Sequence, residues 1–312
     1  MADFTYKVGE AVFENRYVTY SELGLTPPPY TPGYLYSFGR NTDGQLGDST
    51  ITHRSSPVQI GALANWKQVS AGEGHSLSVK TNGTLWAWGL NTNGQLGDGT
   101  VTHRSSPVQI GSLTNWSKIF AGHTHSLAIK TDGTLWAWGK NDNGALGDSS
   151  ATSRSSPVQI GALTTWSQIS AGEDYSLAVK TDGTLWAWGW NQFGQLGNGN
   201  RTSQSSPIQI GALANWKQAD AGGDHSLAVK TDGTMWSWGL NTNGQLGDGT
   251  VTHRSSPVQV GSLTNWSKIS AGYVHSLAVK TNGTLWSWGN NVLVNLVMEL
   301  LHIDHHRYKL VL

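Results

Sequence analysis

Short stretches of the chain alternate apolar and polar residues, and the same four stretches return at a fixed spacing along most of the sequence. In the first unit that holds all four, they read SPVQIG at 56–61, WKQVSAG at 66–72, HSLSVK at 75–80 and TLWAWG at 84–89. A two-residue period is typical of a β-strand with one buried face, and no stretch has the spacing of an amphipathic helix. The pattern predicts an all-β protein with four strands per repeat.

The repeat has a period of 50 residues, since LWAWG begins at Leu85, Leu135 and Leu185, and MWSWG, LWSWG and a weaker LYSFG occur at the same phase. TNGT or TDGT turns precede these strands, and Asn-Gly and Asp-Gly favour tight hairpins because both central residues need a positive φ. A small twisted sheet is marginal by itself, so successive sheets must stack face to face. Units are expected to start at residues 35, 85, 135, 185, 235 and 285.

Tryptophan fits the space between such sheets, because its large ring fills the gap between two stacked faces. Fifteen of the 16 Trp residues fall in three slots of the repeat, and the sixteenth is Trp190. We therefore expect a β-propeller of four-stranded blades in which Trp forms a repeated core and not a scattered ligand platform. The three slots are Trp66, Trp116, Trp166, Trp216 and Trp266; Trp86 and its four equivalents; and Trp88 and its four equivalents.

Four motifs recur in one order: NTNGQLGDGT, SSPVQIG, AGxxHSLAVK and GTLWAWG. They resemble the repeat of the regulator of chromosome condensation family, whose founding fold is a seven-bladed β-propeller. The resemblance covers about residues 34–291. It implies a propeller fold and two kinds of family function, exchange of nucleotide on a small nuclear GTPase and scaffold or recognition roles.

Five four-stranded units fit between Ser56 and Gly289, and YLYSFG at 34–39 is interpreted as an orphan fourth strand. Propellers close their ring by completing one blade with strands from both chain ends. We therefore expect about five complete blades plus partial ones, in an incomplete six- or seven-bladed ring. Its unprotected edge strands predict self-association.

Residues 292–312 break the repeat. Codons can be chosen for this tail so that the same bases, read after the first two are skipped, spell FGQLGDGTTTHRSSPVQIGA, which is the next repeat in register. The hypothesis is that one base is missing in the codon at position 292 and that the tail is a frameshift product. Its clustered imidazoles and carboxylate would otherwise indicate a metal site. These residues are His302, Asp304, His305 and His306.

Residues 1–33 precede the repeat and are interpreted as an N-terminal arm ending in a Pro-rich linker, TPPPYTPG at 26–33. An anchor to a larger assembly is the alternative. Charged residues interrupt the arm throughout, so it does not resemble a secretory signal peptide, and no run of 18 apolar residues predicts a membrane span. A cytoplasmic location is the default expectation.

The chain carries 20 basic and 20 acidic residues, and only 13% of its residues are charged. Zero net charge argues against electrostatic binding of nucleic acid or of an anionic membrane. The absence of Cys excludes disulfides, zinc-thiolate sites and thiol catalysis. No cofactor is predicted.

No catalytic constellation and no metal site is predicted from the remaining polar residues. The HSL slot holds His in four units but Tyr175 in one, which suits a hydrogen bond better than a symmetric ligand set. The Asn- and Asp-rich NTNGQLGDGT loop lacks the closing Glu of a calcium loop and is interpreted as turn material. The imidazoles of the THRSSP motif are expected to bond between blades. The two His sets are His75, His125, His225 and His275, and His53, His103 and His253.

Binding is expected where units differ while their frame stays constant. The two residues before HSL and the residue after WG vary from unit to unit. If these slots share one face, they form a mixed and partly acidic surface; drift at exposed turns is the alternative. The candidate residues are Arg40, Glu73, His123, Lys140, Glu173, Asp174, Trp190, Asp224 and Tyr273.

The leading hypothesis is a non-enzymatic propeller that binds a protein partner or acts as a scaffold. The alternative implied by the resemblance is an exchange factor or regulator of a small GTPase, although that activity depends on divergent blades and loop insertions and this chain keeps its 50-residue period without any. A second alternative is a glycan-binding propeller that uses Trp190 and the loop acids. Near-identical units are typical of a prokaryotic or viral repeat protein.

Overall fold

The computed structural model describes residues 33–290 and 308–310, and these contain 22 β-strands and no helix. The predicted N-terminal arm with its linker and most of the tail, including the cluster of His302, Asp304, His305 and His306, lie outside the described residues. Strands β1 (Leu35–Gly39) and β2 (Arg54–Ile60) form a two-stranded sheet, which we call the half-blade. The other strands form five four-stranded antiparallel sheets, blades 1 to 5.

Within each blade the strands pair in chain order. Blade 1 contains β3 (Trp66–Ala71), β4 (His75–Lys80), β5 (Leu85–Gly89) and β6 (Arg104–Gln109), and blade 2 contains β7 (Trp116–Ala121), β8 (His125–Lys130), β9 (Leu135–Gly139) and β10 (Arg154–Gln159). Blade 3 contains β11 (Trp166–Ala171), β12 (Tyr175–Lys180), β13 (Leu185–Gly189) and β14 (Gln204–Gln209), and blade 4 contains β15 (Trp216–Ala221), β16 (His225–Lys230), β17 (Met235–Gly239) and β18 (Arg254–Gln259). Blade 5 contains β19 (Trp266–Ala271), β20 (His275–Lys280), β21 (Leu285–Gly289) and β22 (Tyr308–Leu310).

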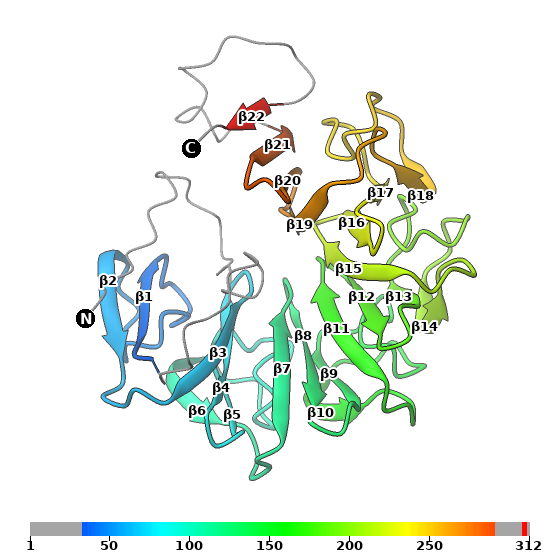
Figure 1. The fold of residues 1–312 in the computed structure, drawn as a ribbon. Helices are drawn as coiled ribbons and strands as arrows, with labels where there is room; N and C mark the ends of the chain where they lie inside the picture. The colour runs from blue at the N-terminus through cyan, green and yellow to red at the C-terminus, as the bar shows by residue number, and fades with distance from the viewer. Residues whose placement is uncertain (1–32, 291–307, 311–312) are drawn as a thin grey trace.

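The blades follow one another around an arc that begins at the half-blade and ends at blade 5, and the described strands leave the arc open between these two (Figure 1). The first strands of successive blades contact each other, so β3, β7, β11, β15 and β19 are the innermost strands. The prediction of an all-β propeller with five complete blades, a partial one and an incomplete ring is confirmed.

The grouping of the strands differs from the prediction. The SPVQIG stretch pairs with the WG strand that precedes it, as Trp86 with Gln109 shows, so it closes a blade and does not open one. LYSFG pairs with β2 and is a third strand, not an orphan fourth strand. The reason is the loop between the third and fourth strands of a blade. Hydrogen bonds within this loop hold it in a shape that returns the chain to the same sheet. In blade 5 the fourth position is occupied by β22, from the tail.

That loop is organised by one buried asparagine, as the loop after β5 illustrates. The Asn91 amide donates to Asp98 Oδ1 and to the carbonyls of Thr100 and Thr102, each at 3.1 Å, while its oxygen accepts from the Leu96 amide at 2.9 Å. The second oxygen of Asp98 pairs with Arg104 at 2.7 Å. The polar atoms of the loop thus bond to one another, in agreement with the turn role predicted for NTNGQLGDGT.

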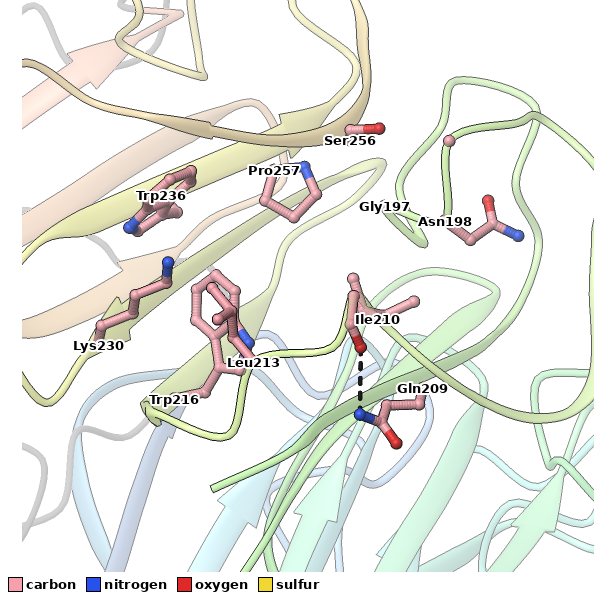
Figure 2. Close-up of a pocket in the computed structure, with 12 residues that line it drawn as sticks. Gly197, Asn198, Gln209, Ile210, Leu213, Trp216, Lys230, Trp236, Ser256 and Pro257 are labelled. Atoms are coloured by element: carbon pink, nitrogen blue, oxygen red, sulfur yellow. Dashed lines mark hydrogen bonds between the residues drawn. The ribbon is translucent and has the colours of Figure 1, made fainter. Parts of the chain in front are cut away.

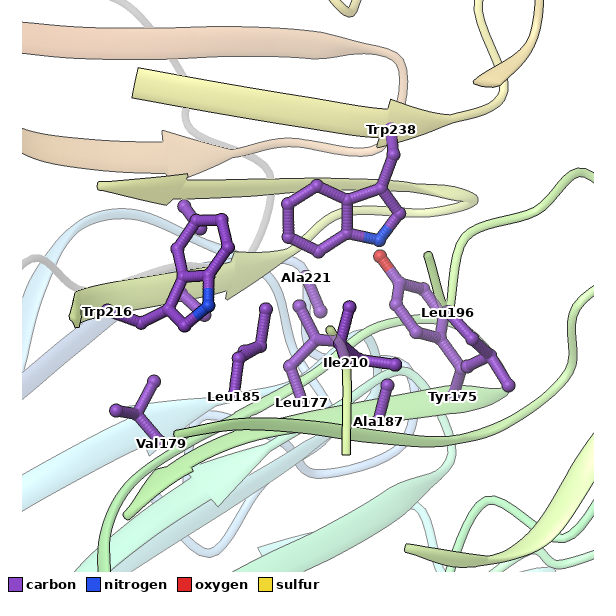
Figure 3. Close-up of a cluster of buried hydrophobic side chains, with 12 residues drawn as sticks. Tyr175, Leu177, Val179, Leu185, Ala187, Leu196, Ile210, Trp216, Ala221 and Trp238 are labelled. Carbon is purple, nitrogen blue, oxygen red and sulfur yellow. The ribbon is translucent and has the colours of Figure 1, made fainter. Parts of the chain in front are cut away.

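The hydrophobic core consists of layers between consecutive blades. In one such layer, Leu177 and Leu185 of blade 3 pack with Trp216, Ala221 and Trp238 of blade 4 (Figure 3). In each blade the Trp of the first slot also contacts the Trp residues of the other two slots. In blade 4 both contacts of Trp216 are edge to face, a geometry that contributes about 0.5–1.5 kcal/mol per pair beyond area burial. The predicted Trp core is therefore confirmed.

Hydrogen bonds fasten each blade to the one before it. Trp138 Nε1 of blade 2 donates to the Gln95 carbonyl at 2.9 Å, and Ser126 Oγ donates to the same carbonyl at 2.8 Å. Gly97 allows the indole to lie close, because a Cβ built there would stand 2.8 Å from Trp138 Nε1, and its φ of +79° also disfavours a side chain. The same contacts recur at every junction between blades.

Candidate interaction face

The two kinds of variable slot lie side by side at one end of each blade. The backbone amide of Lys140, which follows WG, donates to the carbonyl of Thr124, which precedes HSL, at 3.0 Å. Trp190 makes the same bond to Asp174 at 2.9 Å. This pairing recurs in all five blades, so the hypothesis that the slots share one face agrees with the geometry.

The turns before HSL are also linked from blade to blade. The amide of His123 faces the Gly172 carbonyl, and the amide of Glu173 faces the Gly223 carbonyl, each at 3.3 Å. These turns join the innermost strands to the second strands, so together they line one end of the inner wall of the arc.

Side chains from four blades meet across this end. Glu73 Oε2 lies 2.7 Å from His123 Nε2, and the His123 ring lies 6.5 Å, centroid to centroid, from the ring of Tyr273. The Tyr273 hydroxyl donates to Glu173 Oε2 at 3.0 Å. Because Tyr273 belongs to blade 5, its contacts with blades 2 and 3 cross the arc and do not follow it.

Two aspartates extend the group. Asp174 accepts from Lys140 Nζ at 3.1 Å and from Asn143 Nδ2 at 3.1 Å. Asp224 accepts from Gln195 Nε2 at 2.9 Å. We call the set of Glu73, His123, Lys140, Glu173, Asp174, Asp224 and Tyr273 the axial cluster.

The axial cluster is acidic. It holds four carboxylates against one ammonium group and one imidazole. Burial, together with the charges of Glu173 and Asp174, raises the pKa of Asp224 to about 6. Burial and the hydrogen bond to Glu173 raise the pKa of the Tyr273 hydroxyl to about 12, so this group stays protonated and keeps donating. Positively charged groups are the natural complement of such a surface.

Two of the predicted site residues stand apart from the axial cluster. Arg40 belongs to the half-blade, is exposed, and contacts Thr42 and Asp43 within its own loop. Trp190 is aligned with Asp174 through its backbone amide, and its side chain is half-buried.

The HSL imidazoles bond between blades, as predicted for structural residues. His75 Nε2 lies 2.9 Å from Ser126 Oγ, and His125 and His225 repeat the contact. The single proton of Ser126 goes to the Gln95 carbonyl, so His75 Nε2 must be the donor. Burial lowers the pKa of His75 to about 3, which keeps the ring neutral. Tyr175 fills the slot by donating to the His225 carbonyl at 2.5 Å.

The THRSSP imidazoles were expected to bond between blades, and for two of the three this is wrong. His53 Nδ1 accepts from the Asn41 amide at 2.9 Å, and His253 does the same with Asn241, both inside their own loops. The reason is that the amide at the start of the loop needs an acceptor, which the imidazole can reach. His103 faces a polar group of another sheet, at 3.8 Å from Asp43, and His253 contacts blade 3 only through its ring, which packs edge to face on Phe193 at 5.5 Å between centroids.

Sequence reasoning missed Asp220, a buried carboxylate on the innermost strand of blade 4. Its Oδ1 accepts from Ser170 Oγ at 2.8 Å and its Oδ2 from the Ala271 amide at 2.7 Å, so it links three consecutive blades. The available signal was a charged residue in a slot that holds Ser70 and Ser170 in other units.

A cleft of about 360 Å³ lies between the outer parts of blades 3 and 4 (Figure 2). Trp216, Trp236 and Pro257 of blade 4 and Ile210, which follows β14 of blade 3, line it, and Lys230 Nζ lies 3.8 Å from the centre of the Trp236 ring. The same Trp pair and Lys recur in every blade, so the cleft is part of the repeated packing. Among the described residues no three metal-ligating side chains gather, and no helix is long and apolar enough to cross a membrane.

A family model described as the RCC1-like domain matches residues 30–299. No curated protein matches the chain by sequence. Among solved structures, Prp20p of Saccharomyces cerevisiae has a TM-score of 0.73 and 24% identity, covering 84% of this chain and 67% of its own. Yeast RCC1 (Prp20) bound to Kap60 gives 0.71 and 23%, covering 83% and 64%. Human WBSCR16 gives 0.71 and 22%, covering 80% and 67%. The chain thus spans about two thirds of the length of these relatives or slightly less, and the likeness shows a shared fold.

Proposed function

Since the chain belongs to the RCC1-like domain family, we propose that it is a non-enzymatic propeller that binds a protein partner through the axial cluster. One observation carries this proposal. The residues that differ between otherwise similar blades meet in a single group at one end of the arc.

The contrast between frame and turns is sharpest where blade 1 leads into blade 2 and where blade 4 leads into blade 5. Residues 90–118 and 240–268 differ only at Ile110 and Val260. Yet the turns that follow read His123-Thr124 in one and Tyr273-Val274 in the other. Turn residues of different chemistry that follow nearly identical stretches fit a surface that recognises a partner.

The chemistry of the axial cluster selects the kind of partner. Its carboxylates outnumber its cationic groups, and Tyr273 offers an exposed aromatic ring beside them. Interfaces are enriched in such aromatic residues, and charge complementarity sets their specificity. A partner segment with Lys or Arg beside an apolar residue fits this surface. Prp20p, one of the similar structures, has been characterised for its binding to Gsp1p and histones, which supports a protein as the partner class.

Site-specific cross-linking tests the proposal. A photoreactive benzoylphenylalanine at Tyr273 is expected to capture a partner from a lysate, and the same group at the exposed Leu163, between blades 2 and 3, is not. The capture at 273 should weaken when Glu173, Asp174 and Asp224 are changed together to Gln, Asn and Asn. Equal capture at positions 273 and 163, or capture at 273 that the triple change does not weaken, would contradict the proposal.

Regulation of a small GTPase is the second candidate, favoured by the family and by the Gsp1p binding of Prp20p. Release of a fluorescent nucleotide from a panel of small GTPases separates the two. If the chain accelerates nucleotide release and the triple change abolishes this acceleration, the chain is a GTPase regulator. If nucleotide release is not accelerated for any GTPase, this function is excluded. The glycan-binding alternative uses Trp190 and the loop acids, and a glycan array on which the parent shows no binding would dismiss it.

A further inference from the structure

The cleft between blades 3 and 4 holds a buried cation whose hydrogen-bonding groups are not used. Lys230 lines the cleft and is only 5% exposed, and its ammonium group forms no hydrogen bond or ion pair with any residue that the structure describes. Its contacts are with the rings of Trp216 and Trp236, whose centres lie 4.8 and 3.8 Å from Nζ (Figure 2). Since a buried polar group normally has a partner, the N–H groups of this ammonium are left for a molecule in the cleft.

The cleft belongs to the repeated packing, but its rim differs in charge from the rim at the other junctions. Position 198 is Asn, and position 204, on the fourth strand of blade 3, is Gln. In the half-blade and in blades 1, 2 and 4 the same two positions hold an ion pair, Asp48 with Arg54, Asp98 with Arg104, Asp148 with Arg154 and Asp248 with Arg254. Among the residues that line the cleft, Lys230 is therefore the one charged residue, and none is a carboxylate.

The rim of this cleft is also open. A Cβ built on Gly199 would lie 3.7 Å from Ser256 Oγ and within 4 Å of no other atom. At two other junctions a hydrogen bond of 2.9 Å between two Ser hydroxyls crosses the same point, Ser49 with Ser106 and Ser149 with Ser206. Gly99 also leaves its junction without this bond, but Asp98 stands beside it. Blades 3 and 4 thus combine an open rim with the absence of a carboxylate.

The shape and lining of the cleft define what it can hold. Its volume of about 360 Å³ suits a small molecule, since such sites typically measure about 300–1,000 Å³. Its walls are largely apolar and include Ile210, Leu213 and Pro257 beside the two Trp rings. A carboxylate would supply charge-assisted acceptors to the ammonium of Lys230, and an apolar body would fit the walls.

We propose that the cleft between blades 3 and 4 binds a small apolar carboxylic acid, with the carboxylate on Lys230 and the apolar body against Trp216, Ile210 and Pro257. The cleft lies at the start of β15 and the end of β16, whereas Asp224 of the axial cluster lies in the turn that joins the other ends of these strands. The site is therefore separate from the axial cluster and does not depend on the function proposed for it.

Titration calorimetry of the full chain with indole-3-propionate tests the proposal. Saturable binding of one molecule per chain is expected. The neutral indole-3-propionamide should bind at least about tenfold more weakly, because it cannot form a charge-assisted hydrogen bond with the ammonium. In nuclear magnetic resonance spectra of the indole N–H groups, the signals of Trp216 and Trp236 should shift, and those of Trp116 and Trp136 in blade 2 should not.

A pair of lysine variants locates the carboxylate. Lys230→Met keeps an unbranched side chain and removes the ammonium, so it should weaken binding of indole-3-propionate at least about tenfold. Lys130→Met makes the same change between Trp116 and Trp136, where Asp98 is at the rim, and should leave the affinity unchanged.

A third variant tests the rim while keeping Lys230. Asn198→Asp, Gly199→Ser and Gln204→Arg together install the rim found between blades 2 and 3. This variant is expected to fold, because Asp148, Ser149 and Arg154 occupy these positions there and Ser149 already has a φ of 66°. It should bind indole-3-propionate at least about tenfold more weakly. No saturable binding, binding that either the Lys230→Met or the rim change leaves intact, or equal weakening by Lys130→Met would overturn the proposal.

Discussion

Replacing Trp138 by Phe is expected to cost about 3 kcal/mol of unfolding free energy. Trp138 is fully buried between blades 1 and 2 and packs with Leu85, Leu96 and Trp116. Phe lacks about three heavy atoms of the indole, and at about 0.8 kcal/mol each their loss amounts to about 2 kcal/mol, with a cavity adding to it. The lost hydrogen bond adds about 1 kcal/mol, because the Gln95 carbonyl keeps its bond from Ser126.

Trp136→Phe on the same strand is the matched control. Trp136 is half-buried, and its indole donates to Thr134 Oγ1 at 3.0 Å near the surface, where water can replace it. Its replacement should cost about 1 kcal/mol. Urea unfolding followed by circular dichroism measures both variants, and hydrogen exchange in β8 and β9 shows whether the loss is local, since blades can unfold separately. A Trp136→Phe variant as unstable as Trp138→Phe, or a Trp138→Phe cost below about 1 kcal/mol, would refute the reasoning.

Four further outcomes follow. Gly97→Ala should destabilise the junction of blades 1 and 2 by more than about 1 kcal/mol, measured by urea unfolding, because the new methyl group meets an indole and the backbone has a positive φ. The parent should lose stability as pH rises from 3.8 to about 6, because the Asp224 carboxyl keeps its proton to a higher pH in the folded state than in the unfolded state. Asp224→Asn should remove this loss. Thermal unfolding from pH 3 to 7 checks it, and identical pH profiles for parent and variant would contradict it. Asp220→Ala should cost about 1–3 kcal/mol by leaving a buried amide without an acceptor, and Asp220→Ser should cost less, as Ser170 serves the same slot. We also propose that DNA across codons 291 and 292 is compatible with FGQLGDGT in the shifted frame, and incompatible codons would remove the frameshift hypothesis.

The blades could be predicted because the same pattern of strand and Trp positions recurs in every repeat. Alternation marks each strand, and the fixed Trp slots mark a core between sheets. The grouping of strands could not be predicted, because it depends on the loop after WG. That loop returns the chain to the same sheet, and Asn91 bonds its two halves together; adjacency along the chain gives no sign of this.

The site could be predicted in part for a related reason. Variation among near-identical units identifies exposed turns, and Glu73, His123 and Asp224 were found in this way. The contact of Tyr273 with Glu173 joins residues two blades apart, so it depends on the curvature of the arc and not on any local pattern. The role of Asp220 could not be predicted from the sequence, because its hydrogen-bond partners belong to two other blades.

The central claim is that the turns, and not the shared frame, recognise a partner. One variant tests it directly: the axial cluster residues of the turns are all changed to Ser, namely Glu73, His123, Glu173, Asp174, Asp224 and Tyr273. This change leaves every strand residue in place and removes the carboxylates and the two rings of the axial cluster. Quantitative affinity capture with the parent and the variant, with folding checked by circular dichroism, is the measurement. The account predicts that the variant folds and loses the captured partner; a folded variant that captures the same partner equally well would contradict it.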